Sequence, residues 1–151
     1  MRPTTAKFGK MRILLGDGAT PEVFTAPCGL TSKGVSFSKD LSEVNIPDCD
    51  DPDAPDWKAR DVSSLSMEIS GEGLLAAEAV DTWMTAAYTT ESVNAKIEVE
   101  FSIGTTPGTL TFTGAFHVAS FAINGTSGER VQISLSMQSD GEVTYAWAPG
   151  P

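Results

Sequence analysis

Hydrophobic and polar side chains alternate one by one along several stretches of the chain. Between positions 95 and 103, alanine, isoleucine, valine and phenylalanine alternate with lysine, glutamate and serine. The same pattern runs through 131–138 and resumes over 143–147, with turn-forming residues between them at 139–141 and before them at 124–128. A period of two predicts strands that have one buried and one solvated face, as in antiparallel sheets.

Further strands are predicted upstream, clearly at 65–69 and more weakly at 10–15 and 34–38. In 110–123 the apolar positions keep one phase as far as Val118 and then shift to the other. One extra residue in the strand explains such a shift, so we expect a β-bulge near Ala119 and Ser120.

A single segment has the period of a helix. From 74 to 88, apolar residues including Ala79, Trp83 and Ala86 recur three or four positions apart, with acidic residues and threonines between them. We therefore expect one domain spanning 1–151, mainly β, built as an antiparallel sandwich or barrel with one packed α-helix.

Charge narrows the classes of partner. Twenty acidic residues against ten basic ones give a formal net charge of −10, which opposes tight binding to nucleic acid or anionic membranes. No apolar stretch is long enough to span a bilayer, and the first fifteen residues lack the pattern of a secretory signal. We expect a soluble protein made in the cytoplasm, with no membrane partner and with Cys28 and Cys49 reduced and buried.

The segment NIPDCDDPDAPDWKARD, from Asn45 to Asp61, has no regular periodicity and is the core of an acidic loop expected at 41–61. Calcium is the first ligand to consider, but an EF-hand register started at Asp48 or Asp51 places proline at the fifth position. The two cysteines and the only histidine also lack the spacing of a zinc site. The sequence therefore predicts no metal.

Two patterns resemble enzyme motifs. GEGLLA, from Gly71 to Ala76, has dinucleotide-loop spacing, but Glu72 would lie beside a pyrophosphate and the preceding strand is not apolar throughout. Glycines that turn a strand into a helix are the simpler interpretation. His117 could act as a general base for a nucleophilic serine, but the sequence has no G-x-S-x-G motif to supply that serine. We therefore expect no cofactor, no catalytic residue and no enzymatic activity.

Long parts of the chain resemble a known family. They are GKMRILLGDGATPEVFTAPCGLTSKGVSFSKD and the acidic segment after it, the helix LLAAEAVDTWMTAAY, and the closing FAINGTSGERVQISLSMQSDGEVTY. The sequence resembles the major tail proteins, or tail tube proteins, of long-tailed phages, in particular the version found in gene transfer agents. The closing order of strand, turn, polar-alternating strand and glycine before the last strand carries most of this resemblance.

The resemblance implies a structural protein of the virion, made in the host bacterial cytoplasm. Hexameric rings would stack into a hollow tube, with the inward strands of all copies joined into one barrel. The implied partners are other copies of the chain, a tape-measure protein, a tail terminator, a distal tail protein and double-stranded DNA in passage. The alternative from another class is a monomeric β-sandwich module for binding or adhesion, which size in solution would distinguish.

Specific residues follow from that resemblance. The acidic loop would reach the adjacent ring or subunit through Asn45, Asp48, Asp50, Asp51, Asp53, Asp56, Trp57, Lys58 and Arg60. The basic N-terminal arm, 1–8 and the residues just after it, would be its partner through Arg2, Lys7 and Lys10. A wall that DNA passes without sticking needs carboxylates and hydroxyls, and the candidates on polar strand faces are Glu98, Glu100, Ser134 and Ser136.

Overall fold

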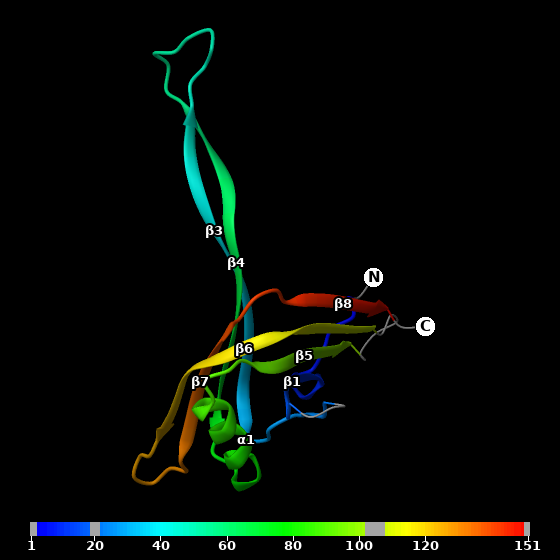
Figure 1. The fold of residues 1–151 in the computed structure, drawn as a ribbon. Coiled ribbons are helices and arrows are strands. Elements are labelled where there is room, and N and C mark those ends of the chain that lie inside the picture. Colours follow the sequence, from blue (N-terminus) through cyan, green and yellow to red (C-terminus); the bar gives the residue numbers. More distant parts are fainter. Residues whose placement is uncertain (1–2, 19–21, 102–107, 150–151) are drawn as a thin grey trace.

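The computed structural model describes residues 3–18, 22–101 and 108–149 (Figure 1). Within them the chain forms eight strands, one α-helix and one short 3-10 helix. The elements in chain order are η1 (Phe8–Lys10), β1 (Met11–Gly16), β2 (Phe24–Thr25), β3 (Leu30–Ile46), β4 (Trp57–Leu74), α1 (Ala77–Tyr88), β5 (Val93–Phe101), β6 (Gly108–Asn124), β7 (Gln132–Ser139) and β8 (Thr144–Pro149).

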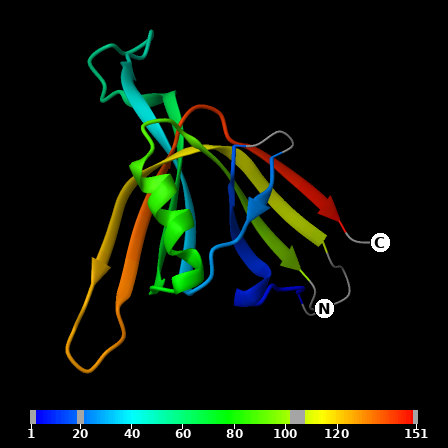
Figure 2. The same cartoon turned by 60° about the horizontal axis from the view of Figure 1, so that its bottom comes forward.

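Strand β6 connects two layers of sheet. Its first half pairs with β5 on one side and β8 on the other, and its second half pairs with β7. The register shifts between Val118 and Ser120, which confirms the predicted bulge. Strands that change sheets at a bulge make the corners of orthogonal sandwiches. Here the strand order β2-β1-β5-β6-β7-β4-β3 folds over at β6, as Figure 2 shows.

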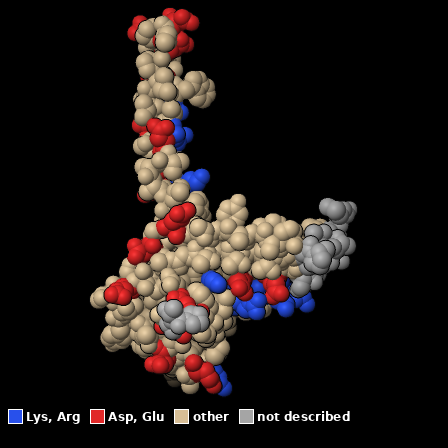
Figure 3. Space-filling model, turned by 45° about the vertical axis from the view of Figure 1, so that its right-hand side comes forward, with Lys and Arg blue, Asp and Glu red and all other residues tan. Residues whose placement is uncertain are grey.

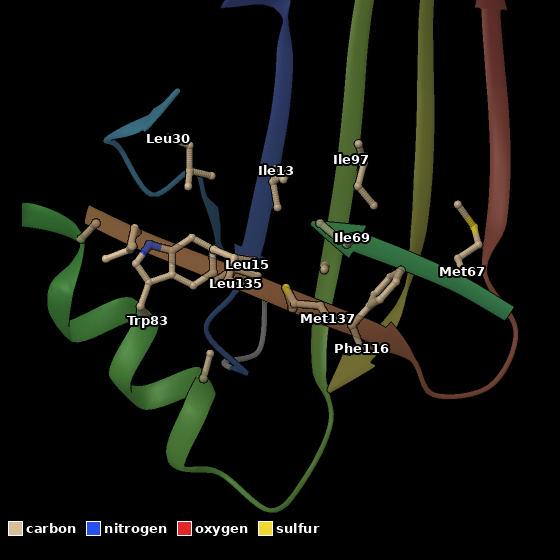
Figure 4. Packing of buried hydrophobic residues seen from close by; sticks show 14 residues of the cluster. Ile13, Leu15, Leu30, Met67, Ile69, Trp83, Ile97, Phe116, Leu135 and Met137 are labelled. Carbon is tan, nitrogen blue, oxygen red and sulfur yellow. The ribbon is translucent and has the colours of Figure 1, made fainter. Parts of the chain in front are cut away.

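We call β6 (second half), β7, β4 and β3 the first sheet, and β8, β6 (first half), β5, β1 and β2 the second sheet. The two layers cross with the apolar core between them (Figure 4). The predicted fold class, mainly β and antiparallel with one helix, is confirmed as an open sandwich and not a closed barrel. The buried side chains are Ile13, Leu15, Leu30, Met67, Ile69, Ala79, Trp83, Ala86, Ala95, Ile97, Phe116, Ile133, Leu135 and Met137.

The helix packs against this core through the predicted face. Ala79, Trp83 and Ala86 are buried, whereas Val80 is exposed. The helix begins at Ala77, three residues later than the pattern indicated, because Leu74 still belongs to β4 and its N–H donates to the carbonyl of Gly29.

The glycines of the GEG motif lie inside β4, and not in a turn leading to the helix as expected. A Cβ at Gly73 would clash with the Gly29 carbonyl oxygen, and one at Gly71 would touch Leu30 and Leu135. They permit close approach of neighbouring backbones and side chains, which gives the motif a packing role.

The segment 41–61, expected as a loop, is mostly a β-hairpin that projects beyond the sandwich (Figure 1). Strands β3 and β4 remain paired from Leu30 with Gly73 out to Ile46 with Trp57, so only residues 47–56 are unpaired. The ladder was not predicted because its distal part has few apolar residues in strict alternation. Cross-strand pairing, including Leu41 with Val62, supplies the regularity that hydropathy lacks.

The start of the described chain packs beside the second sheet. Lys33 of β3 donates to the Met11 carbonyl at 2.7 Å, and its ammonium lies 4.6 Å from the Phe8 ring centroid. This contact joins β3, at one end of the strand order, to β1 near the other end. Burial, and then the nearby Arg12 guanidinium, lower the pKa of Lys33.

Candidate assembly surfaces

The hairpin tip is an unbalanced acidic surface. Residues 47–56 contain five aspartates and no lysine or arginine, and Figure 3 shows acidic atoms gathered at the tip. The turn is held locally, since the Asp50 N–H donates to Asp48 Oδ1 at 2.9 Å and the Ala54 N–H donates to the Asp51 carbonyl at 3.1 Å. Asp53 and Asp56 are exposed like the rest. The tip therefore presents negative charge to whatever lies beyond it.

The two cations of the predicted contact set are paired within the hairpin. Lys58 Nζ lies 3.1 Å from Glu43 Oε2, and Arg60 Nε lies 3.5 Å from Glu43 Oε1. Asn45 stands opposite Lys58 in the ladder. Trp57, whose side chain is 90% exposed, makes no comparable contact in the described part of the chain. Trp57 and the aspartates thus remain available to a partner, and the cations are already engaged.

The basic arm is only partly described. Lys7 and Lys10 flank or end η1 and are exposed, whereas Arg2 lies outside the described residues. Lys33 is close by, so positive charge extends from η1 onto β3, whereas Arg12 is paired with Glu98 and Glu100. Arg12 was already part of the basic start of the sequence, whereas Lys33 was not included in this surface, because only its contact with Met11 brings it there.

The four candidates for a channel wall divide between two faces. Glu98 and Glu100 lie on the outer face of the second sheet, and Ser134 and Ser136 lie on the outer face of the first, with the core between the two sheets. Arg12 Nη2 lies 3.3 Å from Glu98 Oε2 and 3.0 Å from Glu100 Oε2, which neutralises part of their charge. One channel wall can therefore contain Glu98 and Glu100, or Ser134 and Ser136, but not all four.

The outer face of the first sheet is hydroxyl-rich and has no lysine or arginine among its described residues. Ladder pairs connect Ser36 to Glu68, Gly34 to Ser70, and Ser70 to Ser136, and the Ser136 hydroxyl donates to Glu68 Oε1 at 2.9 Å. We call this surface the serine face. It consists of Ser32, Gly34, Ser36, Ser38, Ser66, Glu68, Ser70, Glu72, His117, Ser120, Ala122, Asn124, Gln132, Ser134, Ser136 and Gln138.

The first sheet ends in two unpaired edges. Within the described chain, β3 pairs only with β4, and residues 117–124 of β6 pair only with β7. Each neighbouring pair in the order β3-β4-β7-β6 is antiparallel, so the two edge strands run in opposite directions. Unpaired edges are ready templates for strands of another chain.

The described residues that could take part in catalysis or metal binding are few and lie at the surface. The ring of His117 lies 3.2 Å from Asp140 Oδ2 on the surface, and no group of three or more metal-ligating side chains occurs within the described ranges. Cys28 and Cys49 are exposed, contrary to the expectation of burial, because both lie in connections beyond the ends of β3. Among the described helices, none has the length and apolar character needed to cross a membrane.

A β-sandwich with unpaired strand edges and a projecting hairpin has the features of a class of proteins that can associate with other copies through those surfaces. The chain matches the phage tail tube protein family over residues 6–145, and it belongs to that family. A search of curated proteins found no match in sequence.

Solved structures share the fold. The tail of an empty gene transfer agent particle, refined helically with C6 symmetry, matches with a TM-score of 0.75 at 18% identity, covering 94% of this chain and 99% of that one. The virion of a native gene transfer agent matches with a TM-score of 0.65, also at 18% identity, over 94% and 99% of the two chains. The SPP1 tail tube matches with a TM-score of 0.62 at 12% identity, over 97% of this chain and 79% of that one.

Proposed function

We propose that this chain forms hexameric rings that stack into the hollow tube of a phage or gene transfer agent tail. Family membership supports the tube, and the C6 symmetry of the similar gene transfer agent tail supports six copies in a ring. The role is structural, with no catalytic step.

The two free edges of the first sheet carry this proposal. Rotation about a ring axis keeps each strand's direction along that axis, so β3 of one copy meets β6 of the next in antiparallel orientation. Repeating this contact closes the ring and leaves no exposed edge in the first sheet. With strands about 4.8 Å apart, four strands from each of six copies close a barrel roughly 37 Å across, and wider if tilted.

The serine face then lines the channel. Hydroxyls, amides and the carboxylates of Glu68 and Glu72 hold water and repel phosphate, so DNA passes without a cation to bind it. Ser134 and Ser136 belong to this wall, and Glu98 and Glu100 lie on the outside of the tube. During assembly the channel would enclose a tape-measure protein, and the tube's ends would meet terminator and distal tail proteins.

The hairpin connects copies. Its acidic tip and Trp57 extend well beyond the body and would dock on the adjacent ring or subunit near the basic start of the chain, at Lys7 and Lys10 with Lys33 beside them. Prolines at 47, 52 and 55 restrict the free tip, which reduces the entropy lost on docking.

Negative-stain microscopy and sedimentation of the purified protein test the proposal. We expect six-fold rings and tubes with a central channel. A protein that stays monomeric at every concentration and salt would contradict the proposal and restore the binding-module alternative.

A further inference from the structure

The inner face of the first sheet runs out of the sandwich along the hairpin. Beyond the core residues Met67 and Ile69 the same face continues without cover, because the ladder keeps paired side chains on one side through the bulge after Asp40. We call this exposed continuation the hairpin stripe. It comprises the apolar side chains Phe37, Leu41, Val62 and Leu65, which are between 51% and 60% exposed. Lys39, opposite Leu65, shares this face, and its ammonium lies 5.9 Å from the Phe37 ring centroid.

The inner face of the second sheet also extends past its cover. Tyr145 and Trp147 of β8 stand opposite Phe112 and Leu110 of β6, and Phe112 packs against the core. Tyr145 is nevertheless 74% exposed and Trp147 is 48% exposed. We call Leu110, Tyr145 and Trp147, with Phe101 in edge contact 5.7 Å from the Trp147 ring, the β8 overhang.

The two uncovered surfaces cannot meet within one chain. The hairpin rises away from the sandwich, and β8 points along the second sheet in a different direction (Figure 1). Exposed apolar patches of this kind mark interfaces, and a two-stranded ribbon is marginally stable without a layer against it. Both surfaces therefore leave apolar side chains, and the aromatic rings of the overhang, without a covering layer.

We propose that the hairpin stripe of one copy covers the β8 overhang of a second copy and so completes that copy's sandwich. This rests on the proposed tube function, which brings many copies together. The intramolecular core supplies the precedent, because there the same ribbon, through Met67 and Ile69, already packs across the same sheet at Ile97. The contact joins different patches on the two copies, so it propagates from copy to copy.

The hairpin offers a matched control on its other face. Leu41 lies in the stripe, and Ser42, the next residue, points to the opposite side, where its hydroxyl contacts the Asp61 carbonyl. The two positions are neighbours in β3, so they lie at nearly the same distance from the sandwich along the strand. A difference in cross-linking between cysteines at these two positions therefore shows which face of the hairpin makes the contact, and does not reflect how far the hairpin extends.

Disulfide trapping tests the contact in assembled protein. In a Cys28→Ser/Cys49→Ser background, the Leu41→Cys/Trp147→Cys protein should cross-link into ladders of chains at least about tenfold faster than the Ser42→Cys/Trp147→Cys protein, because contact raises the effective concentration of the two thiols. Equal rates, or a faster control, in tubes seen by microscopy would overturn the inference while leaving the tube itself established. Absence of tubes from the wild-type protein would instead refute the proposed function.

A mixing experiment decides the matter if the cysteine proteins assemble poorly. The Leu41→Ser/Leu65→Ser protein and the Tyr145→Ser/Trp147→Ser protein should each fail to form tubes. When the two are mixed, they should form pairs that contain one copy of each protein. The first protein keeps its β8 overhang and the second keeps its hairpin stripe, so one contact between them can still form. Tubes from either altered protein alone would contradict the contact.

Discussion

Trp83 fills the space between the helix and the first sheet. Its side chain is fully buried, and its ring centroid lies 5.9 Å from that of Phe121. We expect Trp83→Ala to lower the free energy of unfolding by about 3–5 kcal/mol, through lost burial and a cavity. Urea melts would measure this loss. Val80→Ala, on the exposed side of the same helix, is the control and should cost less than about 1 kcal/mol.

Equal losses for the two variants would mean that the helix is not anchored through Trp83. The indole N–H has no acceptor within the described residues, so Trp83→Phe removes an unpaired polar group along with some volume. We expect its cost to fall well below that of Trp83→Ala.

The sequence predicted which way a side chain points wherever hydrophobic periodicity determines it. It did not predict contacts that depend on the register between strands. Alternation placed Ile97 and Met137 toward the core and Glu98 and Ser136 away from it. It gave no sign that Arg12 joins Glu98, since that pair depends on the pairing of β1 with β5. The same limit applies to the division of the wall candidates between two faces.

We expect changes in the hairpin tip to affect assembly without affecting folding. Replacing residues 47–56 with Asn-Gly keeps the last ladder pair, Ile46 with Trp57, and closes it with a favourable two-residue turn. We expect an unchanged circular dichroism spectrum and melting temperature, because the tip contributes no buried side chain. Tube formation should be lost with the acidic contact.

Intact tubes from this shortened protein, seen by negative-stain microscopy, would show that the tip is dispensable. A protein that fails to fold would show that the tip stabilises the ladder itself. The matched control replaces Gly125–Gly128, in the turn between β6 and β7, with Gly-Ser-Gly-Gly, which should leave tubes intact.

The elements themselves were largely predicted. Strong alternation located β5 and β7, and helical spacing located α1 to within three residues. The distal hairpin was not found, because each face of its ladder mixes apolar pairs with charged or polar ones, such as Leu41 with Val62 and then Glu43 with Arg60. Apolar pairs such as Val44 with Ala59, which are fifteen positions apart in the sequence, become apparent only once the register is known.

The whole tube should respond to charge on one face and not on the other. Ser134→Lys/Ser136→Lys would place rings of cations on the channel wall, so DNA delivery should slow at low salt and partly recover as salt screens the attraction. Glu98→Lys/Glu100→Lys changes the outer face and should leave delivery unaffected. Delivered DNA is measured against salt concentration for particles of each kind.

The reverse result, with delivery slowed only by the glutamate variant, would place the second sheet at the channel and leave the tube itself intact. Slowing by both variants would indicate a defect in assembly, which particle counts by microscopy would reveal. Net charge alone predicted a surface that avoids DNA, and the fold is the basis on which we propose which face that surface is.

Because β6 belongs to both sheets, the proposed channel wall and the proposed outer layer of each copy share one continuous strand. No flexible connection separates them, so load applied to the outer layer reaches the wall through covalent backbone. Bending of the tail should then occur between rings, at the hairpin contacts, while each ring keeps its cross-section. The tube is thus expected to behave as a stack of stiff discs on compliant joints, and to curve without pinching its channel.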